Sequence, residues 1–458
     1  MPSSARLPRV LGTAGVTVLS AASMGPAYSL ATTMGPMVAA AGDRAPLALG
    51  LLALLMLAIA VGFGRLARTH PHAGSSYGWA EAAFGRGAGG YAAWLLLLSN
   101  VFAVMATALP AGIYTLALVA PQLAGSPLAS AVVGVGWIVA SAALLAAGLR
   151  PTARASALFL IAEVAVLAAS ALAVVRRTAG VPAHPGSATI LAAASAAPAG
   201  DGGLAGFAAA MVLGIYLADG WEISASASEE TTEARASERG GIAGLVLTTA
   251  VLLLGMNAYL RLGAAALAAH QTDVLAYVGD ALGGGVWRVT IAGAVLLSTA
   301  ATLWATMLYL SRSVFAMGRS GVLPRGLGGL DAAGAPRAAN LGVAACAAVA
   351  TLATGLSPTL ARAIALVLGG TSVFLGALFV LSVAAGVRLA PRGDRFAAAV
   401  VPALGGAGLC AVIVVALVQG DPATRAVEAG GLLLGLPFAA ARSARRPSAK
   451  VKAASQRE

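Results

Sequence analysis

Three carboxylic acids interrupt long apolar stretches of this sequence, namely Glu163, Asp219 and Glu222. Placing a charged side chain in a hydrocarbon environment costs roughly 2.5–3.5 kcal/mol, so acids in such positions are candidates for function. No Lys or Arg lies at a similar depth to pair with them, and we expect one or more of the three to hold a proton at neutral pH. The chemistry that they could perform is the binding of a cation or the transfer of a proton.

Helix-breaking residues occur near the middle of two apolar stretches. Residues 24–28 read Met-Gly-Pro-Ala-Tyr, and Pro26 lacks a backbone donor, which leaves carbonyl groups before it unpaired. Residues 218–222 read Ala-Asp-Gly-Trp-Glu and combine a central glycine with two acids. Free backbone groups are tolerated in a bilayer only against protein or a water-filled cavity. The two interruptions therefore predict a ligand site near the middle of a membrane, with a simple proline kink as the alternative for the first.

The composition requires that these stretches be membrane helices. Of the 458 residues, 59% are hydrophobic and 10% are charged, against about 25% charged in soluble domains, which excludes a soluble globule. A helix needs roughly 20 apolar residues to cross a bilayer. We predict an all-α integral membrane protein with about twelve transmembrane helices, at residues 14–41, 46–66, 90–119, 127–148, 155–176, 203–225, 239–262, 284–311, 338–355, 361–387, 396–418 and 426–441.

The basic residues predict the orientation of these helices. With the amino terminus inside, 22 of the 29 Lys and Arg residues fall on the inner side, so both termini are expected in the cytoplasm and the protein in the cell membrane. Residues 442–458 read as a disordered basic tail that lies near anionic headgroups or only sets the topology. The net charge of +12 is not a sign of nucleic acid binding, because only 5% of residues are aromatic and no basic, aromatic face appears.

The sequence does not predict an enzyme, a metal centre or a cofactor. Two cysteines and four histidines are scattered without the spacing of metal ligands or a disulfide framework. Gly85, Gly87 and Gly90 satisfy the G-x-G-x-x-G pattern, but no strand precedes them. The G-x-S-x-G string at residues 74–78 likewise lacks the strand, helix and histidine of a nucleophile elbow.

Four ordered motifs resemble those of amino acid permeases in the amino acid–polyamine–organocation (APC) superfamily. They are the helix-1 break at residues 24–30, a P-x-A-G-G-x-Y-x-W-like loop at residues 71–79 followed by Phe84-Gly85, a G-W-E…E-E signature at residues 220–222 and 229–230, and an A-R-D-G-x-L-P-like loop at residues 317–324. Two departures stand out. Ala27 replaces the second glycine of the helix-1 motif, and the proline-rich string after helix 6 is reduced to residues 231–239 without proline.

The resemblance implies a five-plus-five inverted repeat with discontinuous helices 1 and 6. The first repeat would span about residues 10–177, the second about 203–390, and two extra helices about 395–441, within one transporter domain of residues 1–441. It implies a permease for amino acids or small amines that works by alternating access, with a proton as the expected coupling ion and sodium as the less favoured one. The oligomeric state does not follow from the sequence.

The resemblance also assigns roles to residues at the breaks. Backbone N–H groups after the first break would face a substrate carboxylate, and carbonyls at the second would face its ammonium group. Asp219 would tilt preference toward cationic amino acids or amines, unless it caps the second half of helix 6. Tyr216 matches a gating aromatic and Trp304 is a weaker inner-gate candidate, although packing explains either. The expected substrate site is Gly25, Pro26, Ala27, Tyr28, Tyr216, Ala218, Asp219, Gly220 and Glu222.

Candidates for ion coupling lie outside the breaks. Glu163 could bind a proton outside and release it inside, or it could remain protonated and donate one hydrogen bond to a helix carbonyl. Ser298, Thr299 and Thr302 could ligate sodium, although hydroxyls more commonly bond carbonyls of their own helix. The rival functions are an amino acid or polyamine exchanger, a sodium-coupled carrier, a passive channel or facilitator and, least favoured, a membrane enzyme.

Overall fold

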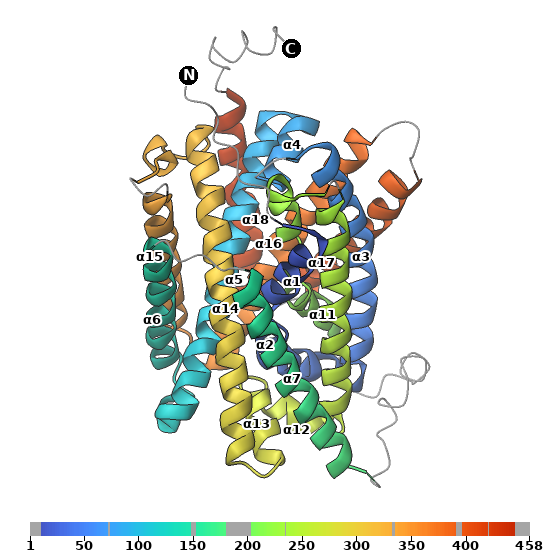
Figure 1. Cartoon of the computed structure of the whole chain (residues 1–458), viewed down its shortest axis with the longest axis vertical. Coiled ribbons are helices and arrows are strands. Elements are labelled where there is room, and N and C mark those ends of the chain that lie inside the picture. The colour runs from blue at the N-terminus through green and yellow to red at the C-terminus, as the bar shows by residue number, and fades with distance from the viewer. Residues whose placement is uncertain are drawn as a thin grey trace.

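The protein is a bundle of helices of different lengths (Figure 1). The computed structural model describes residues 11–71, 74–147, 153–179, 203–233, 235–331, 335–390, 396–419 and 421–444. Two positions of the predicted loop motif, residues 72 and 73, and residues 445–458 of the predicted basic tail lie outside these ranges. Within them, the β-type pairing is one isolated bridge between Leu11 and Thr231.

Most of the α-helices coincide with the predicted apolar stretches. In chain order they are α1 (Thr13–Met24), α2 (Pro26–Ala41), α3 (Ala45–Thr69), α4 (Ser76–Phe84), α5 (Arg86–Val119), α6 (Pro127–Ala146), α7 (Ala153–Arg177), α9 (Gly203–Leu217), α10 (Ile223–Ser226), α11 (Ala236–Leu260), α12 (Ala264–Ala269), α13 (Val274–Ala281), α14 (Val286–Arg319), α15 (Arg337–Thr354), α16 (Leu360–Leu389), α17 (Val401–Gln419) and α18 (Pro422–Ala444). A short π-helical turn at Phe396–Val400 leads into α17.

Nine helical segments in the described ranges are long and apolar enough to cross a membrane. The first of them, Thr13–Thr69, combines α1, α2 and α3 into one continuous run, and α9 is too short to qualify by itself. The structure therefore supports an all-helical, multi-pass protein. The predicted twelve crossings and the inverted repeat are taken up below as proposals.

Several boundaries differ from the sequence prediction. The predicted stretch 203–225 contains the expected interruption: α9 ends at Leu217. After the interruption, α10 is only four residues long. The predicted end at residue 311 is too early, because α14 continues to Arg319, where Val314 and Met317 pack with Tyr77 in one apolar cluster. Burial against protein allows the helix to extend past the hydrocarbon. At about 1.5 Å per residue, a helix of this length is about 51 Å long, well beyond a bilayer core.

Short helices cover the two ends of the bundle. In Figure 1, α4 lies at the upper end, and α12 and α13 lie at the lower end. The sequence prediction treated all three segments as loops. Arg442, near the end of α18, donates from Nη2 to Oε2 of Glu81 on α4 at 2.8 Å. Residues 442–444, which were predicted as the start of a basic tail, are thus part of a helix anchored to α4.

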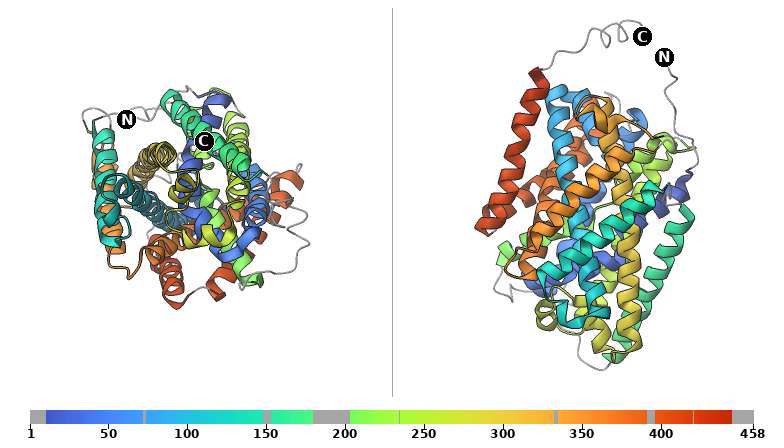
Figure 2. Two further views of the ribbon diagram at one scale, coloured as in Figure 1. Left: turned by 90° about the horizontal axis from the view of Figure 1, so that it is seen from below. Right: turned by 90° about the vertical axis from the view of Figure 1, so that its left-hand side faces the viewer.

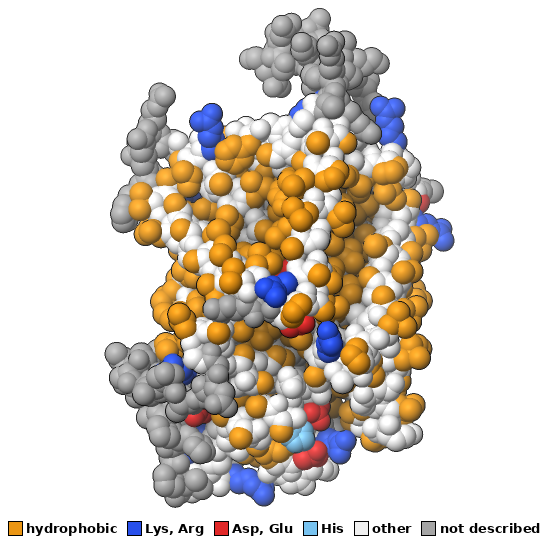
Figure 3. Space-filling model, turned by 180° about the vertical axis from the view of Figure 1, so that it is seen from behind, with side chains coloured by type: hydrophobic (Ala, Val, Ile, Leu, Met, Phe, Trp, Pro, Cys, Tyr) orange, Lys and Arg blue, Asp and Glu red, His pale blue; other side chains and the backbone are white. Residues whose placement is uncertain are grey.

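The long helices enclose a shared core, and their outer faces are apolar. α5 packs against α6, α14, α16 and α18, so it links several parts of the bundle (Figure 2). Hydrophobic side chains cover much of the face shown in Figure 3, with few charged groups among them. Exposed residues on this type of surface include Leu254 on α11 and Leu158 on α7. Such a surface is suited to contact with lipid chains rather than water.

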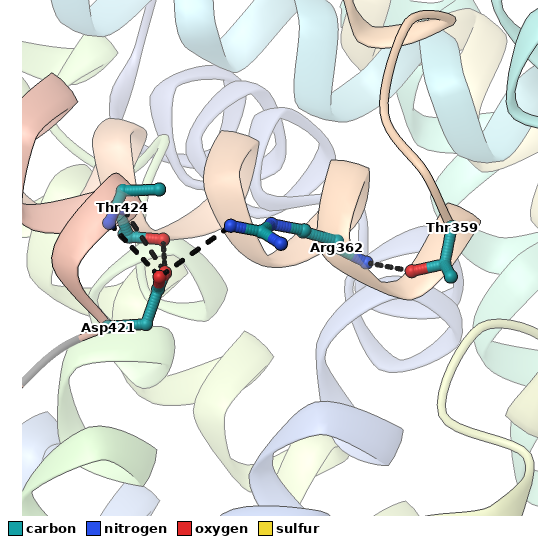
Figure 4. A network of polar contacts seen from close by, with 5 residues as sticks. Thr359, Arg362, Asp421 and Thr424 are labelled. Atoms are coloured by element: carbon teal, nitrogen blue, oxygen red, sulfur yellow. Dashed lines mark hydrogen bonds and ion pairs between the residues drawn. The ribbon is translucent and has the colours of Figure 1, made fainter.

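A polar network joins the beginnings of α16 and α18 (Figure 4). Thr359 caps α16 by accepting from the Arg362 amide at 3.3 Å, and the Arg362 guanidinium lies 3.8 Å from Asp421. Asp421 in turn accepts from the Thr424 hydroxyl and from the amides of Ala423 and Thr424. The Thr424 hydroxyl, together with these amides, lowers the pKa of Asp421. The charged form of Asp421 is therefore favoured, and it holds both helix ends.

Candidate functional site

The first break separates α1 from α2 at a single glycine. Gly25 has φ +52°, in the left-handed region, and Pro26 follows it at the first position of α2. Since Pro26 has no N–H, the first free amides of α2 belong to Ala27 and Tyr28. At the end of α1, the Met24 carbonyl accepts from the Ser29 hydroxyl at 2.6 Å. The chain thus presents a helix C-terminus and a helix N-terminus at one point.

The second break follows α9 and packs directly on the first. Residues 218–222 are not helical, and Gly220 has φ +108°. A Cβ atom on Gly220 would lie 2.8 Å from the backbone carbon of Ser23, so only glycine permits this approach. The Ser20 hydroxyl also donates to the Trp221 carbonyl at 3.4 Å. The two interruptions that the sequence predicted, about 195 residues apart, are in direct contact.

Glu163 on α7 occupies the free amides at the start of α2. Its Oε2 accepts from the Ala27 amide at 3.1 Å, and its side chain is only 1% exposed. The Tyr28 amide donates to Ser298 Oγ on α14 at 3.2 Å, and the Ser298 hydroxyl also bonds Glu163. We call this group the Glu163 cluster: Glu163, Ser298 and the amides of Ala27 and Tyr28. Of the amides of Gly25 and Ala27, which we expected to face a substrate carboxylate, the Ala27 amide donates to Glu163.

A cavity of about 30 Å³ lies between the two breaks. This volume is roughly two to three times what one water needs, so the cavity is small in this conformation. Tyr28 and Tyr216 line it with their rings edge to face, 6.0 Å between centroids. Its lining comes from α1, α2, α5, α9, α10, α14, α16 and the second break, and includes Ser23, Met24, Tyr28, Ser29, Asn100, Thr107, Tyr216, Asp219, Gly220, Glu222, Thr302 and Tyr309.

Asp219 and Glu222 both line this cavity, and their carboxyl groups are hydrogen-bonded to each other. A hydrogen bond between two carboxyl groups requires at least one proton, so this acid pair carries at most one negative charge. The Gly220 amide donates to Glu222 Oε2 at 2.9 Å. No basic side chain is among the described residues that line the cavity. The acid pair therefore faces the cavity without a basic partner in the described lining.

The remaining predicted residues take different positions. Gly25, Pro26 and Ala27 shape the break behind the cavity wall, and Ala218 is buried in an apolar cluster with Met24. Thr302 donates to the Ala22 carbonyl at 3.5 Å, whereas Thr299 bonds the Val295 carbonyl of its own helix. Trp304 packs in a separate cluster with residues of α5, α6 and α15, away from the residues lining the cavity.

Sequence reasoning missed the contribution of α5 and of Tyr309 in the C-terminal half of α14. Asn100, Thr107 and Tyr309 line the cavity, and the Thr107 hydroxyl lies 3.3 Å from the Tyr28 hydroxyl. The sequence did contain an indication of this contribution, because Asn100 is a polar amide inside the apolar stretch 90–119. Thr107 and Tyr309 gave no such signal, because hydroxyls in apolar helices commonly bond their own helix carbonyls.

The fold and the site together define a class of protein. Within the described residues, no group of three or more His, Cys, Asp or Glu side chains could hold a metal ion. The site instead consists of helix ends, hydroxyls and carboxyls around an enclosed cavity between membrane-crossing helices. This arrangement is that of a multi-pass membrane transport protein.

Comparison with known proteins gives the family. The family described as amino acid permease matches residues 11–429, and the chain belongs to this family of transporters, which are not enzymes. The chain is also 27% identical over 311 residues to the branched-chain amino acid permease BcaP of Lactococcus lactis subsp. cremoris (strain MG1363). That match covers 62% of this chain and 63% of the relative, so this chain spans less than two thirds of it.

Proposed function

We propose that this protein is a secondary active carrier for amino acids or small amines. One observation carries the proposal: the two helix breaks pack on each other and enclose a polar cavity. Helix ends at membrane depth offer partial charges that can replace the hydration of a charged substrate. The family is consistent with amino acid transport, and the curated relative is named for branched-chain amino acids.

The proposed mechanism is alternating access within a five-plus-five inverted repeat of twelve helices, two of them C-terminal additions. Its support is positional, since one break lies in the first helix of each proposed half, at α1–α2 and at α9–α10. We place residues 1–441 in one transporter domain and both termini in the cytoplasm, on the basis of the uneven distribution of Lys and Arg. We place the protein in the cell (cytoplasmic) membrane.

For coupling we propose that Glu163 carries a proton. It is buried, it lies against the Ala27 amide at the first break, and it bonds no basic side chain in the described structure. Movement of α2 relative to α7 would alter this contact and so change the stability of the charged form. Sodium is the alternative, held by the Ser298 and Thr302 hydroxyls near the Ala22 carbonyl.

Counterflow in proteoliposomes tests the carrier proposal. Vesicles loaded with unlabelled amino acid or amine should accelerate entry of the labelled compound, because a carrier returns faster when it is loaded. A channel or passive facilitator shows no such acceleration, and that result would overturn the proposal.

Imposed gradients test the coupling ion. Uptake should follow an inward pH gradient and ignore a sodium gradient. Dependence on sodium alone would move the ion site to Ser298 and Thr302. Exchange without net uptake under either gradient would identify an exchanger.

A further inference from the structure

We infer that the preferred substrate is an organic amine that binds through its ammonium group and needs no carboxylate. This inference rests on the proposed carrier function and narrows its substrate class. Three observations support it: an uncompensated acid pair, a buried hydroxyl without a partner, and carboxylate-binding amides that are already occupied.

The acid pair supplies the site for the ammonium group. Asp219 and Glu222 line the cavity, are only partly buried, and share one hydrogen bond between their carboxyl groups. The described lining includes no Lys or Arg, so the carboxyl oxygens of the pair face the cavity without a basic partner there. An ammonium group would supply that missing cation, and its three N–H donors match carboxyl acceptors.

The hydroxyl of Tyr216 is a second group at the cavity that could bind the substrate. Tyr216 is 3% exposed and lines the cavity, yet its hydroxyl has no hydrogen-bond partner in the described structure. An unpaired hydroxyl is costly to bury, which indicates that a bound molecule completes its hydrogen bonding. Tyr216 lies in the last turn of α9, three residues before Asp219 in the second break. An ammonium group bound at the acid pair could donate to both.

Amides after the first break that could bind a substrate carboxylate already donate to protein side chains. The amides of Ala27 and Tyr28, which are the free donors of α2, already donate to Glu163 and Ser298. A substrate carboxylate would have to displace the Glu163 side chain, or else lie in a cavity that already contains the two carboxyl groups of the acid pair. Either arrangement penalises an amino acid relative to the amine with the same side chain.

Matched pairs of compounds test the inference without any mutation. Competition for binding to the purified full chain would compare leucine with 3-methylbutylamine and lysine with 1,5-diaminopentane. We expect each amine to compete at a concentration at least about tenfold lower than its amino acid, which corresponds to about 1.4 kcal/mol. Equal or tighter binding of the amino acids would overturn the inference.

The same pairs in counterflow separate this inference from the carrier proposal. Counterflow of leucine or lysine with no competition by the amines would leave the carrier proposal intact and overturn the inference. The absence of counterflow with all four compounds would overturn both.

Substitutions in the acid pair test whether these residues cause the preference for amines. Asp219→Asn and Glu222→Gln should each raise the half-saturating amine concentration about tenfold or more. Glu428→Gln is the matched control, because Glu428 on α18 is also a buried acid but does not line the cavity. Tyr216→Phe provides a milder test if either acid variant fails to fold, and we expect a several-fold weakening for the amines. Unchanged amine binding in correctly folded Asp219→Asn and Glu222→Gln proteins would overturn the assignment.

Discussion

The Glu163 cluster places a carboxyl group at the first helix break and the acid pair places two at the second, but their surroundings differ. Glu163 is 1% exposed and accepts hydrogen bonds from the Ala27 amide and the Ser298 hydroxyl. Asp219 and Glu222 bond each other and face a cavity. An acid whose partners are all internal is suited to positioning or ion coupling, whereas an acid that faces a cavity is available to a ligand. The same residue type in the same kind of helix thus supports two different proposals.

The largest expected effect comes from a substitution that disturbs both the Glu163 cluster, through Ser298, and the cavity lining, through Tyr28 and Thr302. Gly25→Leu should reduce uptake to background, because φ +52° strains any side chain and the new Cβ would lie 2.4 Å from Thr302 Oγ1. The measurement is uptake by variants that elute as folded protein in size-exclusion chromatography. Gly136→Leu on α6 is the control, since its Cβ has nothing within 4 Å. Wild-type affinity in the Gly25 variant would show that this break is not part of the site.

Glu163→Gln separates coupling from binding. We expect loss of accumulation driven by a pH gradient, with exchange of substrate across the membrane retained, because glutamine can still accept from the Ala27 amide but cannot carry a proton. Glu428→Gln again serves as the control for removal of a buried acid. If both activities survive in the Glu163 variant, Glu163 is a permanently protonated structural residue and the proton-carrier proposal fails.

Ser298→Ala sharpens the description of the Glu163 cluster. The change removes the acceptor of the Tyr28 amide, and a buried donor without a partner costs about 1–3 kcal/mol. We expect a lower unfolding temperature and slower transport. Thr299→Val should have a smaller effect on both, because Thr299 bonds only a carbonyl of its own helix. An increased sodium requirement in the Ser298 variant would instead favour the sodium alternative.

The smallest effect is expected at Trp304. Trp304→Phe should change the half-saturating substrate concentration by no more than about twofold, since Trp304 packs with α6 and α15 rather than on the cavity. Tyr216→Phe, which alters the cavity wall, should have the larger effect. A large change in affinity or in substrate access for the Trp304 variant would restore it as a gate.

The sequence alone indicated most of the long apolar helices and the two points at which the chain breaks them. Apolar length, Pro26, Gly25 and Gly220 act locally, because each sets the conformation of its own few residues. Helix ends that depend on packing were not predictable in this way. The extension of α14 to Arg319 and the helix α4 depend on contacts with one another.

The partners of the functional groups were decided only by the tertiary structure. The sequence singled out Glu163 and Asp219 by charge, but it could not show that one lies against an amide 136 residues away while the other faces a cavity. The presence of an acid in an apolar stretch can be read from the sequence. The hydrogen-bond partners of that acid depend on which helices pack together. For this reason the sequence predicted free amides after the first break, and only the folded chain shows that Glu163 accepts from one of them, the Ala27 amide.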